Sequence, residues 1–193
     1  AAAFYVAQLE SQPVSGPGRK ELADRGVNDD TAARFRLGYA PAVWDALAKH
    51  LTQKGHSIAD AEALGLVLKR RDGRGHYDRF RHRLMFPISD LQGKVVAFSG
   101  RLLAPLDPND PRPTQEPKYV NSPESAIYKK GALLFGLHQA RVEIRRNGWA
   151  VLCEGNFDLV ALHQAGFGNA VAPLGTAFTE VTAKAGLADT RWS

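Results

Sequence analysis

Apolar residues in the first 65 positions recur at the spacing of short helices, and glycine or proline residues interrupt them. Asn28 and Ser57 precede two of these segments and are residue types that cap the first turn of a helix. Gly26, Gly55 and Gly65 follow three of the segments, as expected where helices end. The pattern predicts helices over residues 3–9, 19–25, 28–35, 43–54 and 58–64.

Beyond residue 80 the spacing changes to that of strands. Residues 83–88 and 94–103 are apolar runs separated by a polar turn at residues 89–93, which together predict a β-hairpin. A proline-rich loop follows, and residues 131–145 again have the spacing of a helix. Residues 1–147 are therefore predicted to form an α+β N-terminal subdomain.

From Trp149 onward, strand-like and helix-like segments alternate. Residues 150–153 and 169–172 are short apolar runs, and each is followed by a helical segment, over residues 156–164 and 179–187. This alternation predicts a parallel sheet with helices on its faces. The second predicted unit, residues 148–193, is thus a partial α/β subdomain with a Rossmann-like parallel sheet.

The composition narrows the classes of protein to consider. A chain of 193 residues with 44% hydrophobic content is long enough for one or two compact domains. No apolar run approaches the roughly 18 residues of a membrane helix, and the first residues lack the pattern of a secretory signal. The single cysteine, Cys153, excludes an internal disulfide and a cysteine-cluster zinc site. We therefore expect a cytoplasmic protein with no membrane partner.

The distribution of charge indicates an anionic partner. The chain carries a net charge of +5, and residues 69–101 hold nine lysines and arginines against three aspartates. That local excess of six leaves the rest of the chain close to neutral. A positive excess confined to one segment is typical of a surface that contacts a phosphate backbone.

Two carboxylates lie where an α/β sheet places its active site. Glu154 follows the predicted strand 150–153, Gly155 permits a tight turn, and Asp158 lies one turn into the next predicted helix. Two carboxylates beside a cleft can hold Mg²⁺, which prefers oxygen ligands. On spacing alone, a strand-end glutamate and a solvated helix aspartate are an equally good interpretation. Gly175 and Thr176 follow the next strand, toward the same edge, where they could approach phosphate or metal-bound water, but on the residues alone an ordinary βα turn explains them better.

Basic residues gather around the predicted hairpin. Arg79, Arg81 and Arg83 alternate, so in a strand they would share one face, and Arg101 ends the hairpin's second strand. Three arginines on one face favour phosphate binding, although a solvated strand face is the alternative. The loop after the hairpin carries polar residues that could contact a nucleotide: Lys118, Tyr119, Asn121 and Lys130. On their own, these residues indicate no more than a polar loop.

Taken in order, seven segments resemble the bacterial DnaG-type DNA primases. The segments are ELADRGVNDDTAARFRLGYAP (residues 21–41), YDRFRHRLMFPI, GKVVAFSGRLL, PKYVNSPES, YKKGALLFGL, VLCEGNFDLVALHQAG and VAPLGTAFT. They cover nearly the whole chain in one order, which makes the resemblance specific. It implies a primase core whose N-terminal basic subdomain is followed by the start of a Toprim subdomain.

The resemblance also implies roles for the candidate residues. Glu154 matches the Toprim glutamate that helps to bind catalytic Mg²⁺ (or Mn²⁺) and takes part in nucleotidyl transfer. Asp158 matches the acidic residue that ends this motif, and Gly175–Thr176 match the pair beside the site. The residues that match the basic positions around the template groove and active site are Arg79, Arg81, Arg101, Lys118 and Lys130, with Asn121 in the same loop.

The implied activity is the synthesis of short RNA primers on a single-stranded DNA template from nucleoside triphosphates at the replication fork. The implied partners are the template, the triphosphates, the primer–template hybrid and, through a domain outside this chain, the replicative helicase. The alternatives are a non-catalytic single-stranded DNA-binding module and the primase part of a primase-helicase.

The chain departs from the family pattern in two respects. Asn156 and Phe157 stand where the motif usually has tyrosine and methionine, and we expect them to affect packing. The Asp-x-Asp pair that completes a Toprim metal site is not reached before Ser193, and the family's zinc ribbon is absent from the sequence. We therefore expect this chain alone to bind DNA weakly and to have little or no polymerase activity.

Overall fold

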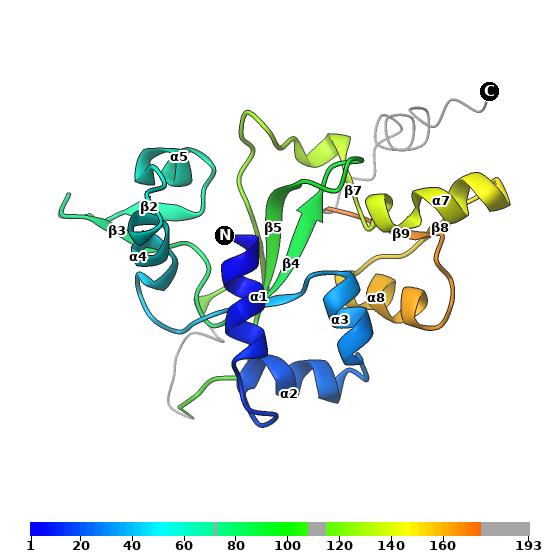
Figure 1. The fold of residues 1–193 in the computed structure, drawn as a ribbon, viewed down its shortest axis with the longest axis horizontal. Helices are drawn as coiled ribbons and strands as arrows, with labels where there is room; N and C mark the ends of the chain where they lie inside the picture. The colour runs from blue at the N-terminus through cyan, green and yellow to red at the C-terminus, as the bar shows by residue number, and fades with distance from the viewer. Residues whose placement is uncertain (72, 108–114, 175–193) are drawn as a thin grey trace.

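In the computed structural model, which describes residues 1–71, 73–107 and 115–174, a central antiparallel sheet lies between a small helical lobe and a second sheet (Figure 1). Three helices open the chain: α1 (Ala2–Glu10), α2 (Pro17–Asp24) and α3 (Asp29–Arg34). The predicted cap of α3 is confirmed, because the Asn28 side chain accepts a hydrogen bond from the Thr31 amide. No described helix is long and apolar enough to cross a membrane.

The central sheet contains the predicted hairpin. Its strands follow the order β1-β4-β5-β6, and each neighbouring pair is antiparallel. The hairpin consists of β4 (Arg83–Ser89) and β5 (Val95–Leu102), and shorter strands flank it, β1 (Gly38–Ala40) and β6 (Tyr119–Asn121). The sequence pattern did not reveal the flanking strands, because three residues are too few to show alternation.

A small lobe carries two helices and a second hairpin. The elements are α4 (Ala46–Gln53), α5 (Ile58–Ala63), β2 (Val67–Lys69) and β3 (His76–Asp78), at the left of Figure 1. Ser57 caps α5 through the Asp60 amide, as its position predicted. The hairpin β2–β3 was not predicted.

Helix α4 begins at Ala46, so the prediction that it starts at residue 43 is wrong. Val43 and Trp44 lie outside the helix and are 56% and 60% exposed. The cause is Asp78, whose carboxylate accepts hydrogen bonds from the amides of Leu47 (2.7 Å) and Ala48 (3.0 Å). The cap of α4 thus comes from β3, about 30 residues away in the chain, and it fixes where the helix starts.

The second sheet follows the order β7-β9-β8. Strands β8 (Val151–Leu152) and β9 (Ala170–Pro173) are parallel and are connected by α8 (Asn156–Gln164), which confirms the predicted βαβ unit. Strand β7 (Leu134–Phe135) adds an antiparallel neighbour to β9. The predicted helix over residues 179–187 lies outside the described residues.

The expected helix over residues 131–145 is only partly correct. The chain forms a 3₁₀ turn, η1 (Lys130–Ala132), then β7, and only then α7 (Leu137–Asn147). Gly136 separates β7 from α7 with φ of +80°. A Cβ atom at that position would lie 2.6 Å from the Leu159 side chain, so the close approach of α8 requires glycine there.

One hydrophobic cluster connects the two sheets. Phe86 of β4, Phe135 of β7 and Phe157 of α8 belong to it, together with Ala172 of β9. The ring centroids of Phe86 and Phe157 are 5.2 Å apart in an edge-to-face arrangement. The fold is therefore α+β followed by partial α/β, as predicted. The boundary between two subdomains at residues 147 and 148 stays a prediction, because the hydrophobic cluster contains residues from both sides of it.

Candidate active-site cleft

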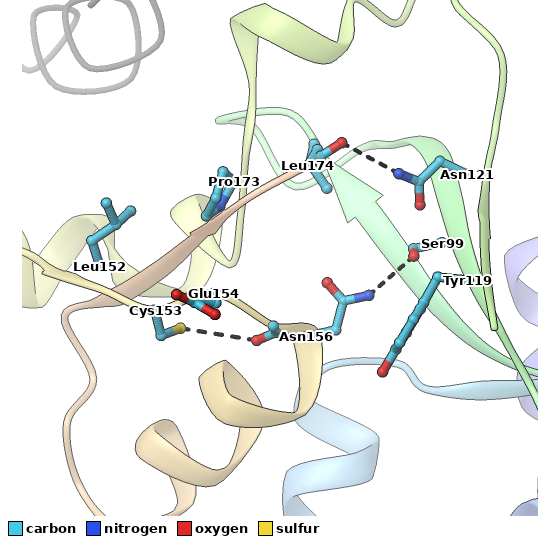
Figure 2. A pocket seen from close by; sticks show the side chains of 10 residues that line it. Ser99, Tyr119, Asn121, Leu152, Cys153, Glu154, Asn156, Pro173 and Leu174 are labelled. Carbon is cyan, nitrogen blue, oxygen red and sulfur yellow. Dashed lines mark hydrogen bonds between the residues drawn. The ribbon is translucent and has the colours of Figure 1, made fainter. Parts of the chain in front are cut away.

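A cleft of about 730 Å³ lies between the edge of the central sheet and the turn that follows β8 (Figure 2). One wall comes from β5 and β6, and the other comes from the β8–α8 turn and the end of β9. The lining residues are Ser99, Tyr119, Asn121, Leu152, Cys153, Glu154, Gly155, Asn156, Pro173 and Leu174. Sequence analysis had placed Glu154 and Asn121 among the site residues, and the cleft brings these two together.

Glu154 is the exposed carboxylate of this cleft. It follows the end of β8, and α8 begins two residues later, so the fold places it at the carboxyl edge of the parallel strand pair. Among the described residues its carboxylate has neither a hydrogen-bond nor an ion-pair partner, and its oxygens are therefore available to a ligand.

Asp158 lies close to Gly155 but does not line the cleft. A Cβ atom at position 155 would approach the Oδ2 atom of Asp158 to 2.8 Å, so glycine leaves room for this carboxylate beside the first turn of α8. A carboxylate in that turn interacts favourably with the positive end of the helix dipole. Whether Asp158 also takes part in catalysis stays a prediction.

The surroundings of the nearby Cys153 thiol favour its protonated form. Burial, reinforced by the negative charge of Asp158, raises the pKa of Cys153 to about 11. The Cys153 Sγ atom lies 3.5 Å from the Val171 carbonyl oxygen. Mg²⁺ prefers oxygen ligands, so of the two side chains it is Glu154 that can bind it.

Residues 1–71, 73–107 and 115–174 contain no group of three or more histidine, cysteine, aspartate or glutamate side chains that could hold a metal ion. Glu154 can supply one oxygen ligand, and Mg²⁺ commonly keeps several water molecules when one or two carboxylates bind it. The described residues therefore fit part of a magnesium site. Gly175 and Thr176, the two other candidates at this edge, lie outside the described residues.

Two side-chain amides connect the walls of the cleft. The Nδ2 atom of Asn156 donates to Ser99 Oγ at 3.0 Å, and the Nδ2 atom of Asn121 donates to the Leu174 carbonyl at 3.3 Å (Figure 2). Asn156 is one of the two departures from the family motif, and its contact connects the start of α8 with β5 of the central sheet. Ser99 was not identified from the sequence.

Phe157, the other departure, lies beneath two arginines. The guanidinium carbons of Arg25 and Arg101 are 5.1 Å and 5.5 Å from its ring centroid. Arg101 is only 8% exposed, and its Nε atom donates to Glu21 Oε1 at 2.8 Å. Its Nη1 atom also donates to the Tyr119 hydroxyl, at 3.3 Å, which places Arg101 directly behind a residue that lines the cleft.

Arg81 lies against two aromatic rings, the exposed ring of Trp44 and the partly buried ring of Tyr77. Its guanidinium carbon is 4.7 Å from the Trp44 ring centroid and 5.3 Å from that of Tyr77. The Arg81 guanidinium also donates to the Asp78 main-chain carbonyl, which holds it in place. Neighbouring Arg79 is partly exposed, and its buried Nε atom has no hydrogen-bond partner among the described residues. No local pattern identified Trp44, because it was assigned to a helix.

Arg79, Arg81 and Arg83 do not share a strand face, so this prediction is wrong. Strand β3 ends at Asp78 and β4 begins at Arg83, and His82 between them has φ of +52°. Arg83 is 1% exposed and donates to the Gly100 and Pro117 carbonyls, both at 3.1 Å. Its Nη2 atom is 2.7 Å from Glu116 Oε2. These contacts fix loop residues against the sheet and leave Arg83 buried away from any template.

Lys118 and Lys130 are exposed and lie outside the residues that line the cleft. Lys118 precedes β6, and its carbonyl accepts a hydrogen bond from the Leu102 amide at 2.8 Å. Lys130 begins η1, and its amide donates to Glu124 Oε1 at 3.2 Å. Their predicted role in nucleotide or template binding stays a prediction.

Comparison with known proteins identifies the family. Residues 4–141 match the model of the DNA primase catalytic core, N-terminal domain, and residues 148–188 match that of the Toprim domain. The first match alone spans more than half of the chain. The chain belongs to the DnaG-type DNA primases.

Among curated primases, that of Synechococcus elongatus is 50% identical over 161 residues, which are 83% of this chain and 22% of that protein. The primase of Mycolicibacterium smegmatis is 43% identical over 180 residues, which are 93% of this chain and 27% of that protein. The chain thus spans about a quarter of the length of these relatives and is part of a primase catalytic core.

Solved primase structures have the same fold. The RNA polymerase domain of Mycobacterium tuberculosis primase, in complex with a double-stranded DNA oligomer with a 6-nucleotide overhang, matches with a TM-score of 0.85 and 38% identity. That match covers 97% of this chain and 57% of the other. A DnaG primase catalytic domain bound to single-stranded DNA matches with a TM-score of 0.80 and 39% identity, over 94% and 55% of the two chains.

Proposed function

We propose that this primase chain binds single-stranded DNA template and supplies a catalytic carboxylate for RNA primer synthesis by the complete protein. The observation that carries the proposal is the position of Glu154, whose carboxylate has no partner among the described residues and lines a cleft opposite the polar edge of β5 and β6. A primer terminus and an incoming nucleoside triphosphate require such a space beside a metal-binding group.

Glu154 would hold Mg²⁺ or Mn²⁺ at this edge, with Asp158 nearby in sequence. When bound, the metal neutralises the developing charge on the transferred phosphoryl group. The remaining residues of the cleft position the nucleotide: the amides of Asn121 and Asn156 and the hydroxyl of Tyr119 offer polar contacts, and Arg101, itself paired with Glu21, holds the Tyr119 hydroxyl in place.

Template binding is assigned to the surface around Arg81 and Arg79. Stacking between an aromatic ring and a base tolerates any sequence, and Trp44 and Tyr77 offer rings beside a positive charge. Related primase domains have been solved with DNA bound, which supports template binding by this chain. Nucleoside triphosphates, the primer–template hybrid and the replicative helicase are expected partners of the complete protein.

The template surface is tested by fluorescence anisotropy of labelled single-stranded DNA across a salt series. The double variant R79A/R81A should bind more weakly, with a salt slope shallower by about 1.4 for two lost phosphate contacts. The matched control R145A/R146A removes two exposed arginines from α7 and should bind like the unmodified chain. Equal affinities for the two double variants would contradict the assignment of the template surface.

A non-catalytic DNA-binding module is the second candidate. Relatives of this fold that have been solved in complex with DNA favour it. The complete primase carrying E154Q separates the two candidates. A loss of primer synthesis of about a hundredfold or more, with unchanged DNA affinity, supports the catalytic role. Unchanged primer synthesis would leave only the binding role.

A further inference from the structure

A second hollow, of about 370 Å³, shares no lining residue with the active-site cleft. It lies where the tip of the β4–β5 hairpin meets the end of α3 and the start of α7. Its lining residues are Arg34, Arg36, Ser89, Gly93, His138, Gln139, Arg141 and Val142. None of them has a role in the primase function proposed above.

The charge of this hollow is uncompensated. Three of its lining residues are arginines, one is a histidine, and none is a carboxylate. Within the described part of the chain, Arg34, Arg36 and Arg141 form no ion pair. Glu143, on the same helix as Arg141, pairs instead with Arg146. Like charges that converge without a counter-charge repel one another, and an anion removes that repulsion.

The backbone holds Arg36 at the hollow in an unusual conformation. Arg36 follows the end of α3 with φ of +52°, and the next amide, that of Leu37, donates to the Ala32 carbonyl at 2.9 Å. Glycine or asparagine usually occupies this left-handed position after a helix. Backbone sterics disfavour an arginine at this position. Ending the helix would not require an arginine, so we attribute its presence to a role of the side chain.

The opposite wall is fixed by the hairpin turn. His138 Nδ1 lies 3.0 Å from the Leu91 carbonyl, and a Cβ atom at Gly93 would come within 2.6 Å of the His138 ring. Gly93 therefore lets the imidazole lie directly over the turn. Arg141, one helical turn later, donates to the His138 carbonyl at 2.6 Å, so that its guanidinium is anchored beside the ring.

We propose that this hollow binds a phosphate-bearing anion. Guanidinium groups present planar N–H pairs that match phosphate oxygens, and three arginines line this hollow, with Ser89 and Gln139 as further donors. The phosphate belongs either to a free pyrophosphate or nucleotide or to the backbone of a nucleic acid. The site is independent of the cleft, so its failure would leave the proposed function untouched.

The test uses the full chain in metal-free buffer at constant ionic strength, with sodium pyrophosphate as the probe. The carbon-bound ring protons of His138, assigned by comparison with H138Q, report on the hollow in two-dimensional NMR spectra. Saturable movement of this signal at millimolar pyrophosphate is the expected result. A signal that does not move, or moves linearly without saturation, would overturn the proposal.

Matched variants distinguish this site from general basicity. The double variant R36Q/R141Q should weaken pyrophosphate binding about tenfold or more, because each lost guanidinium removes charge-assisted hydrogen bonds. The control R145Q/R146Q removes two positive charges as well, both from α7 and outside the hollow, and should stay within about twofold of the unmodified chain. R34Q provides a second variant should the double one unfold. Equal binding by R36Q/R141Q and the unmodified chain would also overturn the proposal.

The source of the phosphate follows from a parallel titration with labelled single-stranded DNA. A loss of DNA affinity in R36Q/R141Q but not in R145Q/R146Q would identify the nucleic-acid backbone as the ligand. Unchanged DNA affinity, with pyrophosphate binding lost, would identify a free polyphosphate. Both results support the anion site and differ only in the molecule that carries the phosphate.

Discussion

At the scale of single residues, Asp78 shows how one buried carboxylate can organise a lobe. It is 2% exposed and accepts hydrogen bonds from two amides at the start of α4. Burial raises its pKa, and these two hydrogen bonds act in the opposite direction. Since its own amide also donates to the Trp44 carbonyl at 2.7 Å, the residue fixes the approach to α4 as well as its first turn.

We expect D78A to lower the free energy of unfolding by about 2–3 kcal/mol, because the amides of Leu47 and Ala48 would lose their partner in a buried site. D78N, which keeps one acceptor oxygen, should cost less. Urea denaturation followed by circular dichroism measures both. The control D60A, at an exposed position on α5, should change stability by about 0.5 kcal/mol or less. A D78A variant as stable as D60A would refute the capping role.

Cys153 provides a pH-dependent prediction. Only the thiolate is alkylated, and the folded-state pKa of about 11 lies above the ordinary thiol value of about 8.5. The alkylation rate of the folded chain should therefore stay low at pH 8 and rise about tenfold per pH unit toward 11. In urea the pH midpoint of the alkylation rate should return to the ordinary thiol pKa. Because the chain has one cysteine, mass spectrometry with iodoacetamide reports on this residue alone. A pH midpoint of the alkylation rate of about 8.5 in the folded chain would contradict the effect of burial on the Cys153 thiol.

At the scale of elements, the segments predicted correctly are those whose signals are local. Helices α3 and α5 have their caps beside them in the sequence, and the hairpin β4–β5 has two long apolar runs around a polar turn. The start of α4 depends on Asp78, and β7 exists because β9 pairs with it. Such partners are distant in the chain, and no window of sequence contains them.

The residues of the candidate site also fall into those with a local signal in the sequence and those that depend on distant partners. Glu154 was found because the end of a parallel strand is a general location for active sites. The burial of Arg83 could not be found, because its partner Glu116 is 33 residues away and belongs to a loop. The pairing of Arg101 with Glu21 spans 80 residues and was equally hidden. A sequence can therefore indicate which arginines are near a site, but only the fold shows which of them are already paired.

Helix α8 is attached to the central sheet mainly through Phe157. We expect F157A to lower the free energy of unfolding by about 3 kcal/mol or more, since the ring packs on Phe86 and beneath Arg25 and Arg101. F157M keeps most of the volume and should cost less than about 1.5 kcal/mol. The control F167A removes a ring that is 51% exposed and should cost much less. Thermal and urea unfolding measure all three, and similar losses for F157A and F167A would contradict this attachment.

At the scale of the whole molecule, the two sheets share one core. Residues of α3, β4, β7, α8 and β9 contribute to the same hydrophobic cluster, and further contacts connect α8 with the N-terminal helices. The side chain of Gln164, the last residue of α8, donates to the Gly26 carbonyl at 2.7 Å and accepts from the Asn28 amide at 2.9 Å. We therefore expect the two subdomains to unfold together.

Hydrogen exchange followed by NMR can measure this cooperativity. Amides of β9 should exchange about as slowly as those of β4 and β5, because Ala170, Val171 and Ala172 are almost fully buried. Amides of the two-residue edge strand β8 should exchange faster, since it has one described neighbour only. Exchange in β9 faster than in β5 by orders of magnitude would show that the second sheet opens independently.

Strand β7 has a consequence for how primases are recombined. Leu134 and Phe135 lie inside the residues that match the N-terminal family model, yet they pair with Pro173 and Ala172 in the second sheet. A chimaeric gene joined between residues 141 and 148 would unite strands inherited from two different parents within one sheet. A junction before residue 130 transfers β7 and α7 together with β8, α8 and β9, so the interchangeable module is longer than the Toprim match.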